Sequence, residues 1–192
     1  MPLNALERLK EGNERFASGK AKTRDWSAKV IATSTGQYPF AAVVGCIDSR
    51  APAEIILDQG IGDILVLRSA GNVIDTDVLG GLEFATNVVG AKYILVLGHT
   101  DCGAVIGAID GVKLGNLTSL LAKIQLAVRH SGPGSSKDKV YVRKVAEQNV
   151  RDSIHEIRER SSILRGLIDS RNVGIAGAIY DISTGRVSFL SD

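Results

Sequence analysis

The sequence predicts an α/β fold in a single domain. We expect a central, mostly parallel four-stranded sheet with an antiparallel edge strand, helices on both faces and an N-terminal helical arm. Short, continuous apolar runs alternate with longer segments of helical periodicity, which is the pattern of successive βαβ units. The last two apolar runs are separated by a turn too short for a crossover helix, so we expect an antiparallel hairpin there.

The composition is that of an ordinary globular protein. The chain has 192 residues, of which 44% are hydrophobic and 23% are charged, enough to bury a full core. The net charge of +2 is small and the basic residues are dispersed, so we expect no nucleic-acid partner. No apolar stretch approaches the roughly 18 residues that span a bilayer, and the first 20 residues do not resemble a secretory signal. We therefore expect no membrane partner and a cytoplasmic protein, whose two cysteines remain free thiols.

Residues 1–38 are predicted to form the helical arm and its connection to an α/β domain at residues 39–192. A helix is expected over residues 4–17, with Leu6, Leu9 and Phe16 as its apolar contacts, and a shorter one over residues 27–33. The apolar stripe of the first helix is thin. It is too small to be buried against its own domain alone, so we expect this arm to pack on a partner subunit.

Five apolar runs are predicted to be strands, because buried parallel strands consist of continuous runs rich in Val, Ile and Leu. The side chains of residues 64–67 are expected to be buried in the second of them. The predicted strands are residues 40–45, 63–68, 91–98, 173–181 and 186–190.

In the segments between these strands, apolar residues recur at helical spacing. Gly90 lies where the C-terminal cap of one helix belongs, and the Gly-Pro-Gly loop at residues 131–136 separates two others. The predicted helices are residues 52–57, 76–89, 102–109, 117–129, 139–160 and 161–169.

Soft metal ligands follow two of the predicted strands. Cys46 comes directly after the first strand, and His99 and Cys102 come after the third, at the carboxyl ends where open α/β sheets place their sites. Two thiolates and an imidazole are three zinc ligands with a fourth position open, as in a catalytic zinc site. Two alternatives stay open: inert buried cysteines, or a structural zinc site in which Asp48 is the fourth ligand.

Asp48 and Arg50 lie two residues apart on the loop that leaves the first strand, so they can form a bidentate ion pair. With Asp48 paired to Arg50, zinc keeps a water ligand, whereas with Asp48 on the metal the site is closed. A zinc ion with an open fourth position binds a water molecule there and lowers its pKa from about 15.7 toward about 7. The backbone of Gly103 and the side-chain amide of Gln37 are candidate donors to the incoming oxygen.

The motif Cys-x-Asp-x-Arg at residues 46–50 and the motif His-x-x-Cys at residues 99–102, with the segment 58–72 between them, resemble those of β-class carbonic anhydrases. The resemblance covers most of the chain. It implies a zinc-dependent lyase, a carbonate dehydratase, that hydrates carbon dioxide reversibly to bicarbonate and a proton with a zinc-bound hydroxide. It also implies a homodimer or homotetramer with each active site at a subunit interface.

The resemblance assigns roles to the motif residues. Cys46, His99 and Cys102 match the ligands of one Zn²⁺ per chain, and Asp48 with Arg50 matches the catalytic dyad.

Further residues are candidate substrate contacts. By resemblance, Gln37 falls where plant-type members carry a glutamine that donates to the substrate, and Phe84 falls where they carry a tyrosine. With Leu65 and Ala70, Phe84 is expected to line an apolar pocket for an uncharged linear molecule, beside the backbone of Gly103.

One departure from the family concerns the state of the site. Some bacterial members close the site with aspartate and hold bicarbonate in an inhibitory pocket of Trp, Arg and Tyr. This chain keeps Arg68 and Tyr180 but has Val43 in place of the tryptophan, so we expect an open site with Asp48 on Arg50. Two other functions stay open: hydrolysis of carbonyl sulfide or carbon disulfide by the same ligands, and a non-catalytic, zinc-stabilised scaffold.

Overall fold

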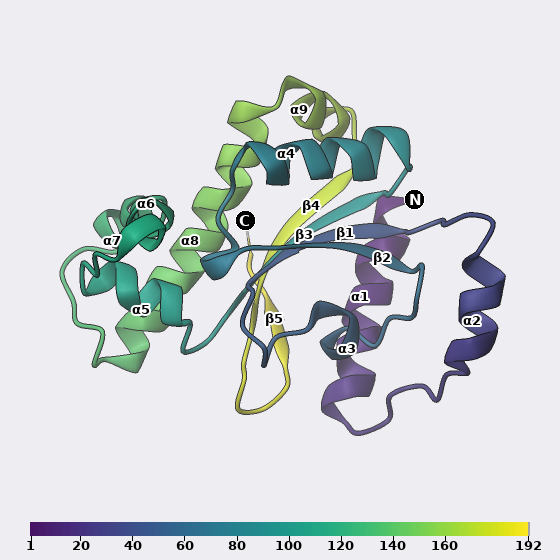
Figure 1. Cartoon of the computed structure of the whole chain (residues 1–192), viewed down its shortest axis with the longest axis horizontal. Helices are drawn as coiled ribbons and strands as arrows, with labels where there is room; N and C mark the ends of the chain where they lie inside the picture. The colour runs from purple at the N-terminus through teal and green to yellow at the C-terminus, as the bar shows by residue number, and fades with distance from the viewer. Residues whose placement is uncertain (192) are drawn as a thin grey trace.

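The computed structural model describes residues 1–191, which form a five-stranded mixed sheet with helices on both faces (Figure 1). The strand order is β2-β1-β3-β4-β5, in which β5 is antiparallel to β4 and the other neighbours are parallel. The predicted fold class and the edge hairpin are therefore confirmed. The strands are β1 (Ala41–Gly45), β2 (Ile64–Arg68), β3 (Tyr93–His99), β4 (Gly174–Tyr180) and β5 (Val187–Phe189).

Alternate side chains of the central strands point into two separate hydrophobic clusters. Ala41 and Val43 face the cluster that contains α1 and α3, while Ala42 and Val44 face the cluster that contains α4, α5 and α8. Figure 1 shows these two groups of helices on opposite sides of the sheet. The helices are α1 (Pro2–Ala17), α2 (Trp26–Thr33), α3 (Ala53–Ile56), α4 (Thr76–Glu83), α5 (Gly103–Ile109), α6 (Gly115–Ala122), α7 (Gln125–His130), α8 (Lys139–Arg160) and α9 (Ser162–Asp169), with a 3₁₀ turn η1 (Ala70–Asn72) and a π-helical turn η2 (Phe84–Val88).

Two predicted helices differ from the structure. The helix expected over residues 117–129 is divided into α6 and α7, because tighter turns at Lys123 and Ile124 direct the fully buried Ile124 into the core. The helix expected over residues 76–89 is α-helical only to Glu83 and continues as η2. Gly90 follows with φ of 93°, as expected of a C-terminal cap. None of the described helices is both long enough and apolar enough to cross a bilayer.

The second strand is less buried than predicted. Ile64 to Leu67 are only half-buried. The reason is that β2 is an edge strand with β1 as its single neighbour, so its outer side lacks a covering strand.

The helix α1 buries part of its apolar stripe against its own domain, while Leu6 and Phe16 stay partly exposed. Leu9 is fully buried among sheet and α3 residues of the same chain. Small residues explain this packing: Ala5 is buried beside Leu9, and a Cβ atom at Gly12 would lie 1.9 Å from the carbonyl oxygen of Leu57. The close approach of the two backbones explains why Leu9 is covered by its own chain.

Candidate metal centre

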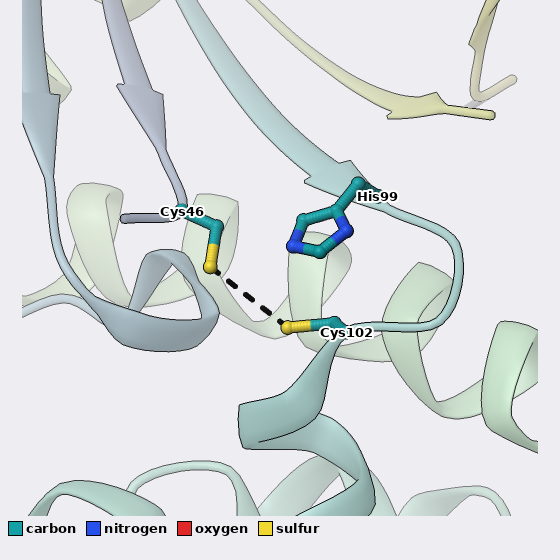
Figure 2. Close-up of side chains that lie close together, drawn as sticks. All are labelled: Cys46, His99 and Cys102. Carbon is teal, nitrogen blue, oxygen red and sulfur yellow. Dashed lines mark hydrogen bonds between the residues drawn. The ribbon is translucent and has the colours of Figure 1, made fainter. Parts of the chain in front are cut away.

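Three potential metal ligands meet at the carboxyl edge of the sheet. Cys46 follows β1, His99 is the last residue of β3, and Cys102 is the residue before α5. Because β1 and β3 are parallel neighbours, with Gly45 opposite Leu97, their ends deliver these side chains to one place. Figure 2 shows the two sulfur atoms and the imidazole ring converging from these elements.

The geometry of the three ligands suits a tetrahedral zinc ion. The two Sγ atoms are 3.9 Å apart, and the ligand atoms of Cys46, His99 and Cys102 all lie within 4.8 Å of one another. Two sulfurs bonded to tetrahedral zinc at about 2.3 Å would be separated by about 3.8 Å. The three side chains are at most 5% exposed, and both cysteines are free thiols rather than a disulfide.

The histidine ring is oriented with one nitrogen free. His99 Nδ1 lies 2.9 Å from the carbonyl oxygen of Thr100, which can only accept, so Nδ1 carries the proton. Nε2 is buried and has no hydrogen-bond partner among the described residues. A buried, unpaired lone pair is unfavourable unless it binds something, and a metal ion fits this donor set.

The electrostatics of the cysteine pair favour a thiolate at Cys46. A hydrogen bond from the Cys102 thiol lowers the pKa of Cys46 to about 4, despite burial, and His99 and nearby backbone N–H groups add to the effect. The same hydrogen bond, together with burial, raises the pKa of Cys102. Burial lowers the pKa of His99, but the negative charge of the nearby Cys46 sulfur, the Thr100 carbonyl and the Asp48 carboxylate together outweigh burial and raise it overall. The direction of these shifts favours the thiolate form of Cys46, which is the form that binds a metal ion.

Asp48 and Arg50 form the bidentate pair that their spacing predicted. Arg50 Nε donates to Asp48 Oδ1 at 2.9 Å, and Arg50 Nη2 donates to Oδ2 at 2.8 Å. The guanidinium hydrogen bond holds the pKa of the Asp48 carboxyl well below its usual range. Asp48 Oδ2 lies 3.8 Å from His99 Nε2, so an ionised carboxylate borders the ligand set while remaining tied to Arg50.

Two contacts were not foreseen from the sequence. Arg68 donates to the carbonyl oxygens of Cys46 at 2.8 Å and Asp48 at 2.7 Å, so it braces the loop that carries both side chains. The N–H of Gly71 donates to Cys46 Sγ at 3.3 Å. Both contacts join chain segments that meet only in the fold, so the sequence does not reveal them. For the contact of Gly71, the one signal is the glycine itself, in the segment Ala-Gly-Asn.

The predicted substrate residues divide into two groups. Ala70 begins the turn that contacts Cys46, and Gly103 directly follows Cys102, so both lie beside the ligands. Gln37, Leu65 and Phe84 lie away from the metal centre of their own chain.

The path of the chain explains this separation. Gln37 is exposed and precedes β1, whereas Cys46 follows it, and Leu65 is opposite Ala42 near the start of that strand. Phe84, 52% exposed, follows α4, which runs back from the carboxyl edge of the sheet to the amino edge where β3 begins. Motif matching places residues along the chain but does not show to which edge of the sheet they belong.

Comparison with known proteins gives consistent matches. A protein-family model described as carbonic anhydrase matches residues 41–187. Carbonic anhydrase 2 of Mycobacterium tuberculosis is 37% identical over 96% of this chain and 91% of its own length, and the carbonic anhydrase of Mycolicibacterium smegmatis is 34% identical over 99% and 94%.

Solved structures agree with these matches. The β-carbonic anhydrase CafA of Aspergillus fumigatus superposes with a TM-score of 0.77 at 28% identity, covering 92% of this chain and 91% of that one. Tetrameric β-carbonic anhydrases from Sordaria macrospora include one with a TM-score of 0.78 at 26% identity, covering 98% of each chain.

Proposed function

Because this chain belongs to the β class of the carbonic anhydrase family, we propose that it catalyses the reversible hydration of carbon dioxide to bicarbonate and a proton. The supporting observation is the meeting of three buried ligand atoms within 4.8 Å of one another. Cys46, His99 and Cys102 would hold one Zn²⁺ per chain. The 3.9 Å separation of the sulfurs and the unpaired Nε2 of His99 support this assignment.

The metal and the dyad have separate tasks in this proposal. When bound, zinc supplies the Lewis acidity that makes water a nucleophile near neutral pH. Asp48 stays ionised and accepts a hydrogen bond from the attacking water, which orients the oxygen lone pair toward the carbon of carbon dioxide. Arg50 occupies both Asp48 oxygens and so keeps the carboxylate from taking the fourth ligand position. This pairing favours an active, open site over a closed scaffold.

Substrate contacts come from two sources in the proposal. The backbone N–H of Gly103 donates to the oxygen of carbon dioxide on which charge develops, and Ala70 supplies an apolar contact. Gln37, Leu65 and Phe84 serve the site of a second copy, in a homodimer or homotetramer. The uncovered edge of β2 and the exposed Trp26 and Phe84, each 52% exposed, support such an interface. The two free thiols support a reducing, cytoplasmic compartment.

A matched pair of histidine variants tests the proposal. His99→Ala should lose bound zinc and carbon dioxide hydration together, because it removes one of three ligands. His155→Ala, which changes an exposed histidine of α8, should keep both. Zinc analysis and stopped-flow hydration are measured on the same samples.

The same samples separate this function from its rivals. Carbonyl sulfide hydrolysis with negligible hydration would replace the proposed substrate, and a zinc-loaded protein without either activity would indicate a scaffold.

A further inference from the structure

A buried amide on α8 lies behind the turn that contacts the Cys46 sulfur. The turn η1 has two consecutive left-handed residues, Gly71 with φ of 67° and Asn72 with φ of 46°. This conformation directs the N–H of Gly71 to Cys46 Sγ, 3.3 Å away. A left-handed, non-glycine residue such as Asn72 is unfavourable without support from its surroundings.

That support comes from α8. Asn149, which is 4% exposed, donates from Nδ2 to the carbonyl oxygen of Gly71 at 2.8 Å. One helical turn later, Ser153 Oγ lies 3.5 Å from the carbonyl oxygen of Asn72. The carbonyl oxygens of both left-handed residues therefore contact side chains of α8.

Two glycines in the sheet permit α8 to lie this close. A Cβ atom at Gly98 of β3 would be 2.8 Å from a methyl carbon of Val150, and one at Gly177 of β4 would be 2.5 Å from the other. Side chains at either position would push α8 outward and carry Asn149 away from the turn. The reach of Asn149 is thus a specific consequence of helix–sheet packing.

We propose that Asn149 is a positioning residue of the metal centre, which fixes the Gly71 amide so that it hydrogen-bonds the Cys46 thiolate. An N–H donor draws electron density from a metal-bound sulfur, so the metal would retain more positive charge. Asn149 touches neither metal nor substrate and acts through Gly71. The inference rests on the metal centre of the proposed function.

The wild-type protein provides the first test. ¹¹³Cd replaces zinc in a sample labelled with ¹⁵N-glycine, and scalar coupling between the metal and amide protons is measured by NMR. A coupling from ¹¹³Cd to the Gly71 amide proton is expected across the N–H···S hydrogen bond. Bound ¹¹³Cd with sulfur ligation but no such coupling would overturn the role of Asn149, while absence of sulfur-ligated ¹¹³Cd would instead overturn the metal centre itself.

Variants then connect the hydrogen bond to Asn149. Asn149→Asp removes the donor to the Gly71 carbonyl, and Asn149→Ser removes the amide without adding charge, in case the first variant fails to fold. Gln148→Ala, at the adjacent and partly exposed position of α8, is the matched control. We expect loss of the coupling, at least tenfold faster hydrogen exchange at Gly71, and a zinc Kd raised about 10–100-fold in the Asn149 variants only.

The pattern of exchange distinguishes positioning from plain stability. Protection of the β3 amides should stay at its wild-type level in the folded Asn149 variants. Uniformly faster exchange throughout the protein, or zinc affinity equal to that of Gln148→Ala, would refute the inference.

Discussion

Replacing Gly12 by alanine should destabilise the protein, although alanine is the better helix former. In an exposed helix interior the change stabilises by about 0.8–1 kcal/mol. At Gly12 the added Cβ would lie 1.9 Å from the Leu57 carbonyl oxygen, where ordinary contact begins at 3.4 Å. The helix α1 must therefore move outward by more than about 1 Å.

That movement uncovers Leu9, which is fully buried. Burial of a leucine side chain stabilises by about 1.5–3 kcal/mol, so a partial loss outweighs the gain in helix propensity. We expect a net loss of about 1–2 kcal/mol in the free energy of unfolding. Gly166→Ala is the control, because Gly166 is an exposed α9 residue with nothing within 4 Å of an added Cβ, and it should stabilise.

Urea unfolding followed by circular dichroism, at several protein concentrations, measures both variants. The midpoint should fall for Gly12→Ala and rise for Gly166→Ala, with little change in the slope. Equal stabilisation by both substitutions would refute the reasoning, since it would mean that α1 does not lie against Leu57 of its own chain.

Three other predictions concern the metal centre. Arg50→Gln should keep one zinc per chain but lower carbon dioxide hydration at least about 100-fold, because the oxygens of Asp48 are no longer held in their orientation. Zinc analysis and stopped-flow assays measure the two quantities. Unchanged turnover would contradict this prediction. The folded-state pKa of Asp48 lies below its unfolded value of about 3.9, so its pairing stabilises the fold above that pH and the contribution is lost as pH falls through the folded pKa. Asp48→Asn should accordingly reduce the fall in Tm between pH 5 and 3, measured by calorimetry, and an identical fall in both proteins would argue against the pair. Chelation of the metal should lower Tm reversibly, and free zinc at 100 times its Kd should stabilise by about 2.7 kcal/mol; a Tm indifferent to zinc would count against a bound ion.

The strands and the three ligands could be predicted because their signals are local. A continuous apolar run of five to seven residues is a strong signal for a strand, and Cys46 and His99 come directly at the ends of such runs. The rule that parallel strands place functional groups at their carboxyl ends then joins residues that are far apart in the sequence. The ion pair of Asp48 with Arg50 is likewise a short-range feature of one loop.

Other features depend on contacts between distant segments, and the sequence pattern does not encode them locally. The half-buried state of β2 follows from its place at the edge of the sheet, and the burial of Leu9 follows from the close approach permitted at Gly12. Gln37 and Phe84 have the residue types that a substrate pocket needs, yet the path of the chain puts them at the opposite edge from Cys46.

The sequence by itself determined the fold class, the approximate elements and the chemistry of the metal ligands, because periodicity and ligand type are properties of short segments. The tertiary structure decided which surfaces are covered and which groups orient the ligands. The Gly71 amide and the Asn149 side chain illustrate the difference: each is ordinary in its own segment, and their relation to Cys46 exists only because α8 packs closely against β3 and β4. Close packing is a cooperative, long-range property, so it becomes visible only when the whole chain is folded.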